Sequence, residues 1–166
     1  DPVRVSSDAP RYASLDELVA ASDLVVRARV VATERGRVFG EPTDEGGGAI
    51  VSRLVTLAVT DVLAAPDGQP APTELLVEEE GWTLDGAPLV VDGLPPSAEG
   101  DDAVWFLAAP PAAGGEGAPA HVTVNAQGRY VVDGDRLVGA DLDDPLVAEL
   151  AALAPDDLEA AVRATG

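Results

Sequence analysis

The side chains of this chain that could do chemistry are almost all carboxylates. The 166 residues include 30 aspartates and glutamates, one histidine (His121), and no cysteine or methionine. All ten basic residues are arginines. Thiol and disulfide chemistry are therefore excluded, and any acid–base or metal chemistry would depend on Asp and Glu.

Serine-hydrolase chemistry is not indicated. It needs a nucleophile, a base and an oxyanion hole, and the chain has no G-x-S-x-G segment. His121 follows a proline-rich loop in an alternating stretch, so we expect a solvent-facing strand residue. A carboxylate-dependent hydrolase stays open as an alternative, and it would require two acids that face one cleft about 5–10 Å apart.

Calcium is the metal that suits this composition, because it prefers carboxylate and carbonyl oxygens. A single histidine without cysteines cannot supply a zinc or copper site. Five aspartates cluster near a predicted turn, without the spacing of an EF-hand loop. We interpret them as turn and helix-capping residues, keep a weak calcium-binding structural protein as an alternative, and expect no cofactor. These aspartates are Asp133, Asp135, Asp141, Asp143 and Asp144.

The formal net charge of −20 bears on the partners of the chain. Nucleic-acid binding depends on Lys and Arg that neutralise phosphates, so it is excluded, and anionic membrane surfaces are disfavoured for the same reason. No apolar run reaches the roughly 18 residues of a membrane span, so we expect no membrane insertion. The charge would attract cations or proteins with basic faces.

Local patterns predict one short helix near the start of the chain and two at its end. Ser14 is a good N-cap and Glu17 stands three residues later, which completes a capping box for a helix ending at residues 22–23. Residues 145–153 and 155–164 have amphipathic spacing, and each begins with a proline.

Between these helices the pattern favours antiparallel strands. Arg27 and Arg29 alternate with apolar residues in the first strand, and we expect them to pair with Glu78 or Glu80 across the sheet. Residues 34–48 and 110–119 have the composition of loops, and 133–135 that of a hairpin turn. The expected strands span residues 24–33, 50–63, 74–80, 89–91, 102–109, 121–125, 129–132 and 136–139.

The long irregular segment 81–100 is the best candidate for a binding surface. Trp82 stands at a strand-to-loop junction, where an exposed aromatic ring could contact a partner. In the alternative, purely structural interpretation, the Trp82 ring covers one end of the barrel. Leu94, Pro95 and Pro96 continue the candidate partner-binding surface.

These elements predict a mainly β protein with short flanking helices, built as a small antiparallel OB-like barrel. Closure would remove the exposed edges of such apolar strands. We expect an extended leader at 1–13, and a single domain at 14–166 that ends in the C-terminal helices. The first residue is Asp1, so we expect an exported protein whose signal segment has been removed.

The order of these segments resembles uncharacterised secreted or envelope-attached proteins of actinobacteria with an OB-like barrel. The resemblance covers about residues 14–163 and implies a barrel like that of netrin-like and metalloproteinase-inhibitor modules. Those inhibitors bind zinc through an N-terminal cysteine, which this chain lacks, so their mechanism is not implied. The segments that carry the resemblance are 14–19, 21–26, 59–63, 93–95, 102–107 and 127–132.

These observations together predict a non-enzymatic, secreted or cell-envelope module that binds another protein. We expect a strongly acidic exterior and no catalytic residues. The composition is rich in Ala, Gly, Asp, Val, Pro and Arg and has no lysine, which is typical of a GC-rich actinobacterial genome.

Overall fold

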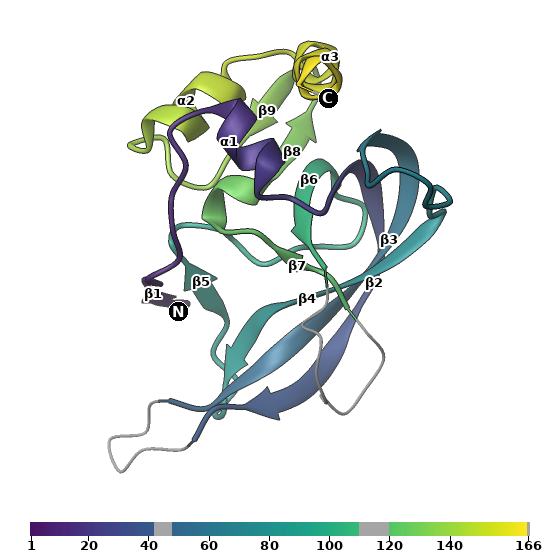
Figure 1. Ribbon diagram of the computed structural model, residues 1–166. Coiled ribbons are helices and arrows are strands. Elements are labelled where there is room, and N and C mark those ends of the chain that lie inside the picture. Colours follow the sequence, from purple (N-terminus) through teal and green to yellow (C-terminus); the bar gives the residue numbers. More distant parts are fainter. Residues whose placement is uncertain (42–47, 110–119, 166) are drawn as a thin grey trace.

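The computed structural model describes residues 1–41, 48–109 and 120–165, which form a mainly β fold with a few short helices (Figure 1). The fold class expected from the sequence is confirmed at this level. The helices are α1 (Leu15–Ala20), α2 (Pro145–Ala151) and α3 (Pro155–Ala164), with a 3₁₀ turn at Ala126–Gly128. The strands are β1 (Val3–Val5), β2 (Leu24–Phe39), β3 (Ile50–Ala64), β4 (Glu74–Thr83), β5 (Leu89–Val91), β6 (Asp102–Ala108), β7 (Val122–Thr123), β8 (Arg129–Asp133) and β9 (Arg136–Val138).

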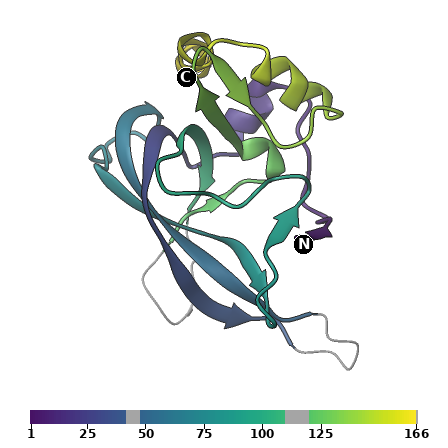
Figure 2. The ribbon, with the colours of Figure 1, turned by 180° about the vertical axis from the view of Figure 1, so that it is seen from behind.

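Seven strands form one antiparallel sheet in the order β4-β3-β2-β6-β8-β9, and β7 also pairs with β6. The strands β1 and β5 form a separate parallel pair. In Figure 1 the three helices gather at one end of the molecule, around β8 and β9, and the long β2–β3 hairpin extends toward the other end. The view from behind shows the same division (Figure 2).

The expected closed barrel is not confirmed, because the sheet is not closed by strand ladders. Among the described residues, β4 meets the segment that leads into β7 through a single parallel bridge between Val77 and His121. The Glu78 N–H donates to the His121 carbonyl and the His121 N–H donates to the Leu76 carbonyl, both at 2.8 Å. A single bridge leaves most backbone groups of the β4 edge without a strand partner.

His121 was expected to face solvent, but it is partly buried at this bridge. Burial lowers the pKa of its imidazole below the usual 6.5, and the charge of Asp23 opposes that shift. The folded chain therefore binds fewer protons here than the unfolded chain does, so stability is lost as the pH falls below about 6.5. We expect the wild type to lose more free energy of unfolding than His121→Gln between pH 7.5 and 5.5.

Urea denaturation of both proteins at the two pH values measures this difference. The variant keeps the backbone bridge and lacks only the titrating ring, so carboxylate titration cancels in the comparison. Equal losses in the two proteins would contradict the prediction.

The apolar core has two parts that share the central strand β6. Val104 and Phe106 face the helices and pack with Leu18, Leu150 and Leu158. Trp105 and Leu107 point to the opposite face, where they pack against the inner sides of β2, β3 and β4. Alternate residues of a strand point to opposite faces, so a strand covered on both faces is apolar throughout.

The helix caps follow the predicted local chemistry. Ser14 accepts from the Glu17 N–H at 3.2 Å, while the Glu17 carboxylate accepts from the Ala13 N–H at 2.8 Å. Helix α1 ends at Ala20, two residues before the predicted end. Asp144 caps α2 through the N–H groups of Leu146 and Val147. The hairpin turn at 133–135 is confirmed between β8 and β9.

The predicted ion pairs of the first strand are wrong. Arg27 binds Asp102 at 2.9 Å and Glu159 at 3.0 Å, and so ties α3 to the sheet. Strand β3 lies between β2 and β4, so no β2 residue is paired with a β4 residue in the sheet. Glu78 does bind a β2 arginine, but that residue is Arg37, at 2.8 Å.

The expected loop at 34–48 is wrong over its first part, because β2 continues to Phe39. Pairing with β3 extends as far as Phe39 and Ile50. The last part of this loop, residues 42–47, and the predicted loop at 110–119 lie outside the described residues.

Candidate functional site

A buried ion cluster lies on the inner face of the sheet, directly beneath the predicted binding surface. It consists of Arg53 on β3, Glu79 on β4, Arg129 on β8 and Ser97 in the loop after β5. We call these four residues the ion cluster. Residues 94–97, which it holds, are called the strap.

Glu79 is the centre of the ion cluster. Its carboxylate accepts from the backbone N–H and the hydroxyl of Ser97, both at 2.9 Å. The same carboxylate lies 3.3 Å from Arg129 Nη1 and 3.5 Å from Arg53 Nε. One negative charge thus pairs with two guanidinium groups, so the four residues of the cluster carry a net positive charge.

The two arginines also hold the backbone of the strap. Arg129 donates to the Pro95 carbonyl and to the Ser97 hydroxyl, and Arg53 donates to the Ser97 carbonyl at 3.2 Å. The Arg129 side chain is only 2 % exposed. Burial lowers the pKa of Arg129, and the charge of Glu79 opposes this shift. Removing Glu79 would therefore take from this buried cation the carboxylate that pairs with it, and would leave only the weaker influence of Asp101.

Aromatic rings flank the ion cluster on both sides. The Arg53 guanidinium lies 4.3 Å from the centre of the Trp82 ring, and that of Arg129 lies 5.5 Å from the Trp105 ring. The exposed Arg35 also lies over Trp82, at 5.0 Å. Such contacts contribute about 0.5–2 kcal/mol each, and they orient Trp82 at the rim of the sheet.

The predicted binding residues form two groups, Trp82 and residues 94–96, and Arg53 connects them. Trp82 is partly buried and reaches the strap through Arg53. Leu94, Pro95 and Pro96 line a shallow pocket of about 20 Å³ together with Leu89, Val91 and Glu80. That volume holds about one water molecule, whereas small-molecule sites are typically 300 Å³ or larger.

Sequence reasoning missed the ion cluster itself. One signal was present: Arg53 has the same strand parity as Val51, Val55 and Leu57, which are buried. Glu79 likewise has the parity of Leu75 and Val77. A charged residue at an inward position requires a buried partner, so the pattern indicated a buried pair without identifying its members.

The five calcium candidates do not form a ligand group. Asp133 and Asp135 are exposed around the β8–β9 turn, while Asp144 caps α2 and binds Arg11 at 2.7 Å. Within residues 1–41, 48–109 and 120–165, no group of three or more acidic, histidine or cysteine side chains could hold a metal.

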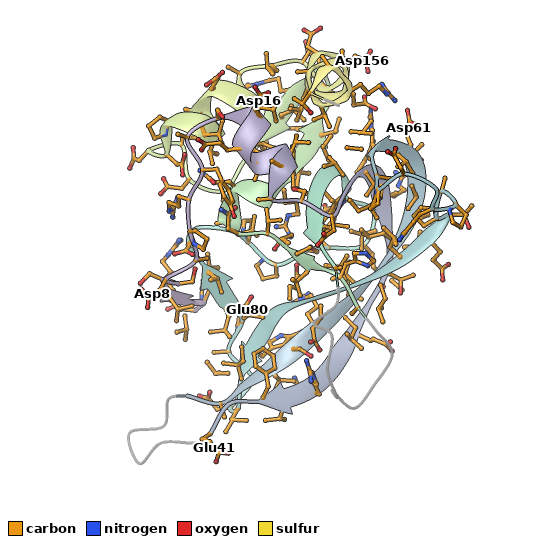
Figure 3. The ribbon with its side chains drawn as sticks, in the orientation of Figure 1. Asp8, Asp16, Glu41, Asp61, Glu80 and Asp156 are labelled. Carbon is orange, nitrogen blue, oxygen red and sulfur yellow. The ribbon has the colours of Figure 1, made fainter. Side chains whose placement is uncertain are left out.

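The carboxylates of this fold are paired or dispersed. The most buried ones in the described ranges, Asp144 and Glu159, are bound to Arg11 and Arg27 respectively. Exposed acids are spread from the helical end, at Asp156, to the far hairpin, at Glu41 (Figure 3).

No family model and no curated protein sequence matches this chain. None of the helices described here has the length and apolar character needed to cross a membrane.

Proposed function

We propose that this chain is a non-enzymatic, secreted or cell-envelope module that binds another protein through the surface formed by Trp82 and residues 89–97. The observation that supports this proposal most directly is the ion cluster, which holds the backbone of the strap around the exposed Pro95. Pro95 is exposed while Ser97, two residues later, is buried and bound by three charged side chains.

Holding the strap in place lowers the cost of binding. A loop that is already ordered loses little conformational entropy when a partner docks, so more of the contact energy contributes to affinity. Trp and Arg are also the residue types that dominate the energy of protein interfaces. Trp82 with Arg35 and Arg53 therefore provides an anchor beside a rigid apolar surface.

An OB-like barrel remains part of this proposal. The bridge between Val77 and His121 joins β4 to the segment before β7, at the seam where such a barrel would close. The acidic exterior favours a partner with a basic face, since opposite charges speed encounter.

Trp82→Ala tests the binding surface. We expect about a 30-fold or greater loss of partner capture, corresponding to a hot-spot contribution of at least about 2 kcal/mol. Immobilised wild type and variant would be exposed to an envelope extract of the source organism, and the captured proteins quantified by mass spectrometry.

Val138→Ala is the matched control, because Val138 is an exposed apolar residue on β9. Strands β9 and β4 are the two outermost strands in the order of the sheet, so this residue is remote from Trp82. It should capture the same protein at the wild-type level. Circular dichroism would establish that both variants are folded at the assay temperature. Unchanged capture by Trp82→Ala would remove this surface from consideration.

A further inference from the structure

Strand β1 is attached to the molecule in an unusual way. It pairs with β5 alone, in parallel, with Val3 opposite Leu89 and Val5 opposite Val91. Figures 1 and 2 both place it beside β5, outside the main sheet. All three of its residues are exposed, with Val3 at 39 % and Val5 at 41 %, whereas Leu89 of β5 is 4 % exposed.

Backbone hydrogen bonds therefore account for most of the attachment. The Val3 N–H donates to the Pro88 carbonyl and the Asp92 N–H donates to the Val5 carbonyl, both at 2.9 Å. Because Val3 and Val5 turn their backbone groups toward β5, the N–H and C=O of Arg4 point to the opposite side.

The chain that follows β1 adds little to this attachment. Residues 6–11 are exposed and belong to no helix or strand. They are held by Ser7, which binds Asp92, by Pro10, whose carbonyl accepts from Asn125, and by Arg11, which binds Asp144 at 2.7 Å. Residues 1–9 can therefore open while Pro10 and Arg11 stay attached, because among the described residues only the β1–β5 hydrogen bonds and Ser7 hold them, and this opening uncovers the edge of β5.

We infer that the edge of β5 is a strand-addition site, where an extended segment of the partner protein replaces β1 and runs parallel to β5. This inference rests on the proposed function, because β5 lies within the proposed surface and leads directly into the strap. Recognition by strand addition takes its affinity from backbone hydrogen bonds and its specificity from alternate side chains.

The surroundings of β5 define the chemistry of the incoming segment. Leu89 and Val91 line the same shallow pocket as Leu94 and Pro95, so apolar side chains of the incoming segment would pack over a largely apolar surface on that side. Asp8 lies beside β1 and Glu80 near β5 (Figure 3), and Asp92 follows β5 directly. An alternating apolar–basic–apolar segment, as in Val3-Arg4-Val5, matches both features.

The test uses two full-length variants that differ only in which backbone N–H is lost. Val3→Pro removes the N–H that binds the Pro88 carbonyl, which weakens the chain's own β1 and opens the edge of β5. Arg4→Pro removes an N–H that points away from β5, so it is the matched control. The probe is the peptide DPVRVSS, which has the sequence of residues 1–7.

Titration of the peptide into ¹⁵N-labelled protein measures its binding at the amides of Val90 and Asp92. We expect the Val3→Pro protein to bind the peptide at least tenfold more tightly than the wild type or Arg4→Pro. A peptide that itself carries Val3→Pro should cause no shift. Equal binding by all three proteins, or shifts confined to other elements, would overturn the inference.

A second copy of the chain is the competing occupant, and sedimentation of the wild type distinguishes it, because the wild-type β1 keeps the N–H that an exchanged strand would donate. A dimer formed by exchange of β1 would overturn the assignment to a partner segment, whereas a monomer supports it. Partner capture separates this inference from the proposed function. If Trp82→Ala abolishes capture while the peptide does not bind, the surface is used without strand addition, and only the present inference fails.

Discussion

Replacing Glu79 by glutamine is expected to lower the free energy of unfolding by about 3–5 kcal/mol. Glutamine keeps the shape of the side chain but removes the only negative charge within ion-pairing distance of Arg53 and Arg129 among the described residues. Two largely buried guanidinium groups would then lie near each other without the carboxylate that pairs with both of them. Domains of this size are stabilised by about 5–15 kcal/mol in total, so the loss is a large part of the whole.

Glu80→Gln is the matched control, because it makes the same chemical change at the next residue. Glu80 is exposed and makes no ion pair within the part of the chain that the structure describes. Its replacement should change stability by no more than about 0.5 kcal/mol. Urea denaturation of the three proteins gives the comparison, and similar losses for the two variants would show that Glu79 does not hold the cluster together.

The Glu79 variant also bears on function. Its carboxylate binds the backbone and hydroxyl of Ser97, so the strap should lose its fixed conformation when this charge is removed. Partner capture should then fall even where the protein stays folded, since the entropic advantage of an ordered loop is lost.

Replacing Trp105 by alanine is expected to cost about 3–5 kcal/mol of stability. The side chain is fully buried, and its indole N–H donates to the Ala28 carbonyl at 3.4 Å. The ring also lies under the Arg129 guanidinium. The variant therefore loses apolar burial, leaves a cavity in the inner core, and withdraws an aromatic contact from a buried cation.

Trp82→Ala provides the internal comparison, because the same substitution is made at the rim of the sheet. Trp82 is only partly buried, so truncation opens the site to water instead of leaving a closed cavity. Its cost should be clearly smaller than that of Trp105→Ala. Thermal and urea unfolding measure both, and equal costs would place Trp82 in the structural core instead of the binding surface.

Much of the fold could be predicted because its signals are local. The capping box of Ser14 and Glu17 begins a helix, and the continuous apolar run within 102–109 forms the central strand. The full length of β2 could not be predicted, because Arg35, Gly36 and Arg37 have the composition of a loop. These residues are extended because β3 pairs with them, which is a tertiary effect that overrides their propensity.

The sequence indicates only part of the candidate site. Residue types and loop context predict a contact surface at Trp82 and the proline pair, and this stays a prediction. Strand β1 gave no signal, since three residues of a polar leader carry no periodicity that distinguishes a strand. The pairing of Arg27 with Asp102 and Glu159 was missed because it depends on strand order.

The amino-acid sequence by itself determined most of the strand and helix positions, the net charge of −20 and the inward parity of Arg53 and Glu79. The elements and the parity follow from the pattern of neighbouring residues, and the net charge follows from the count of charged residues in the chain. Only the tertiary structure decided that Arg53, Glu79, Ser97 and Arg129 meet beneath the strap. They come from three strands and a loop, and their meeting depends on the order and curvature of the sheet, which no local pattern encodes.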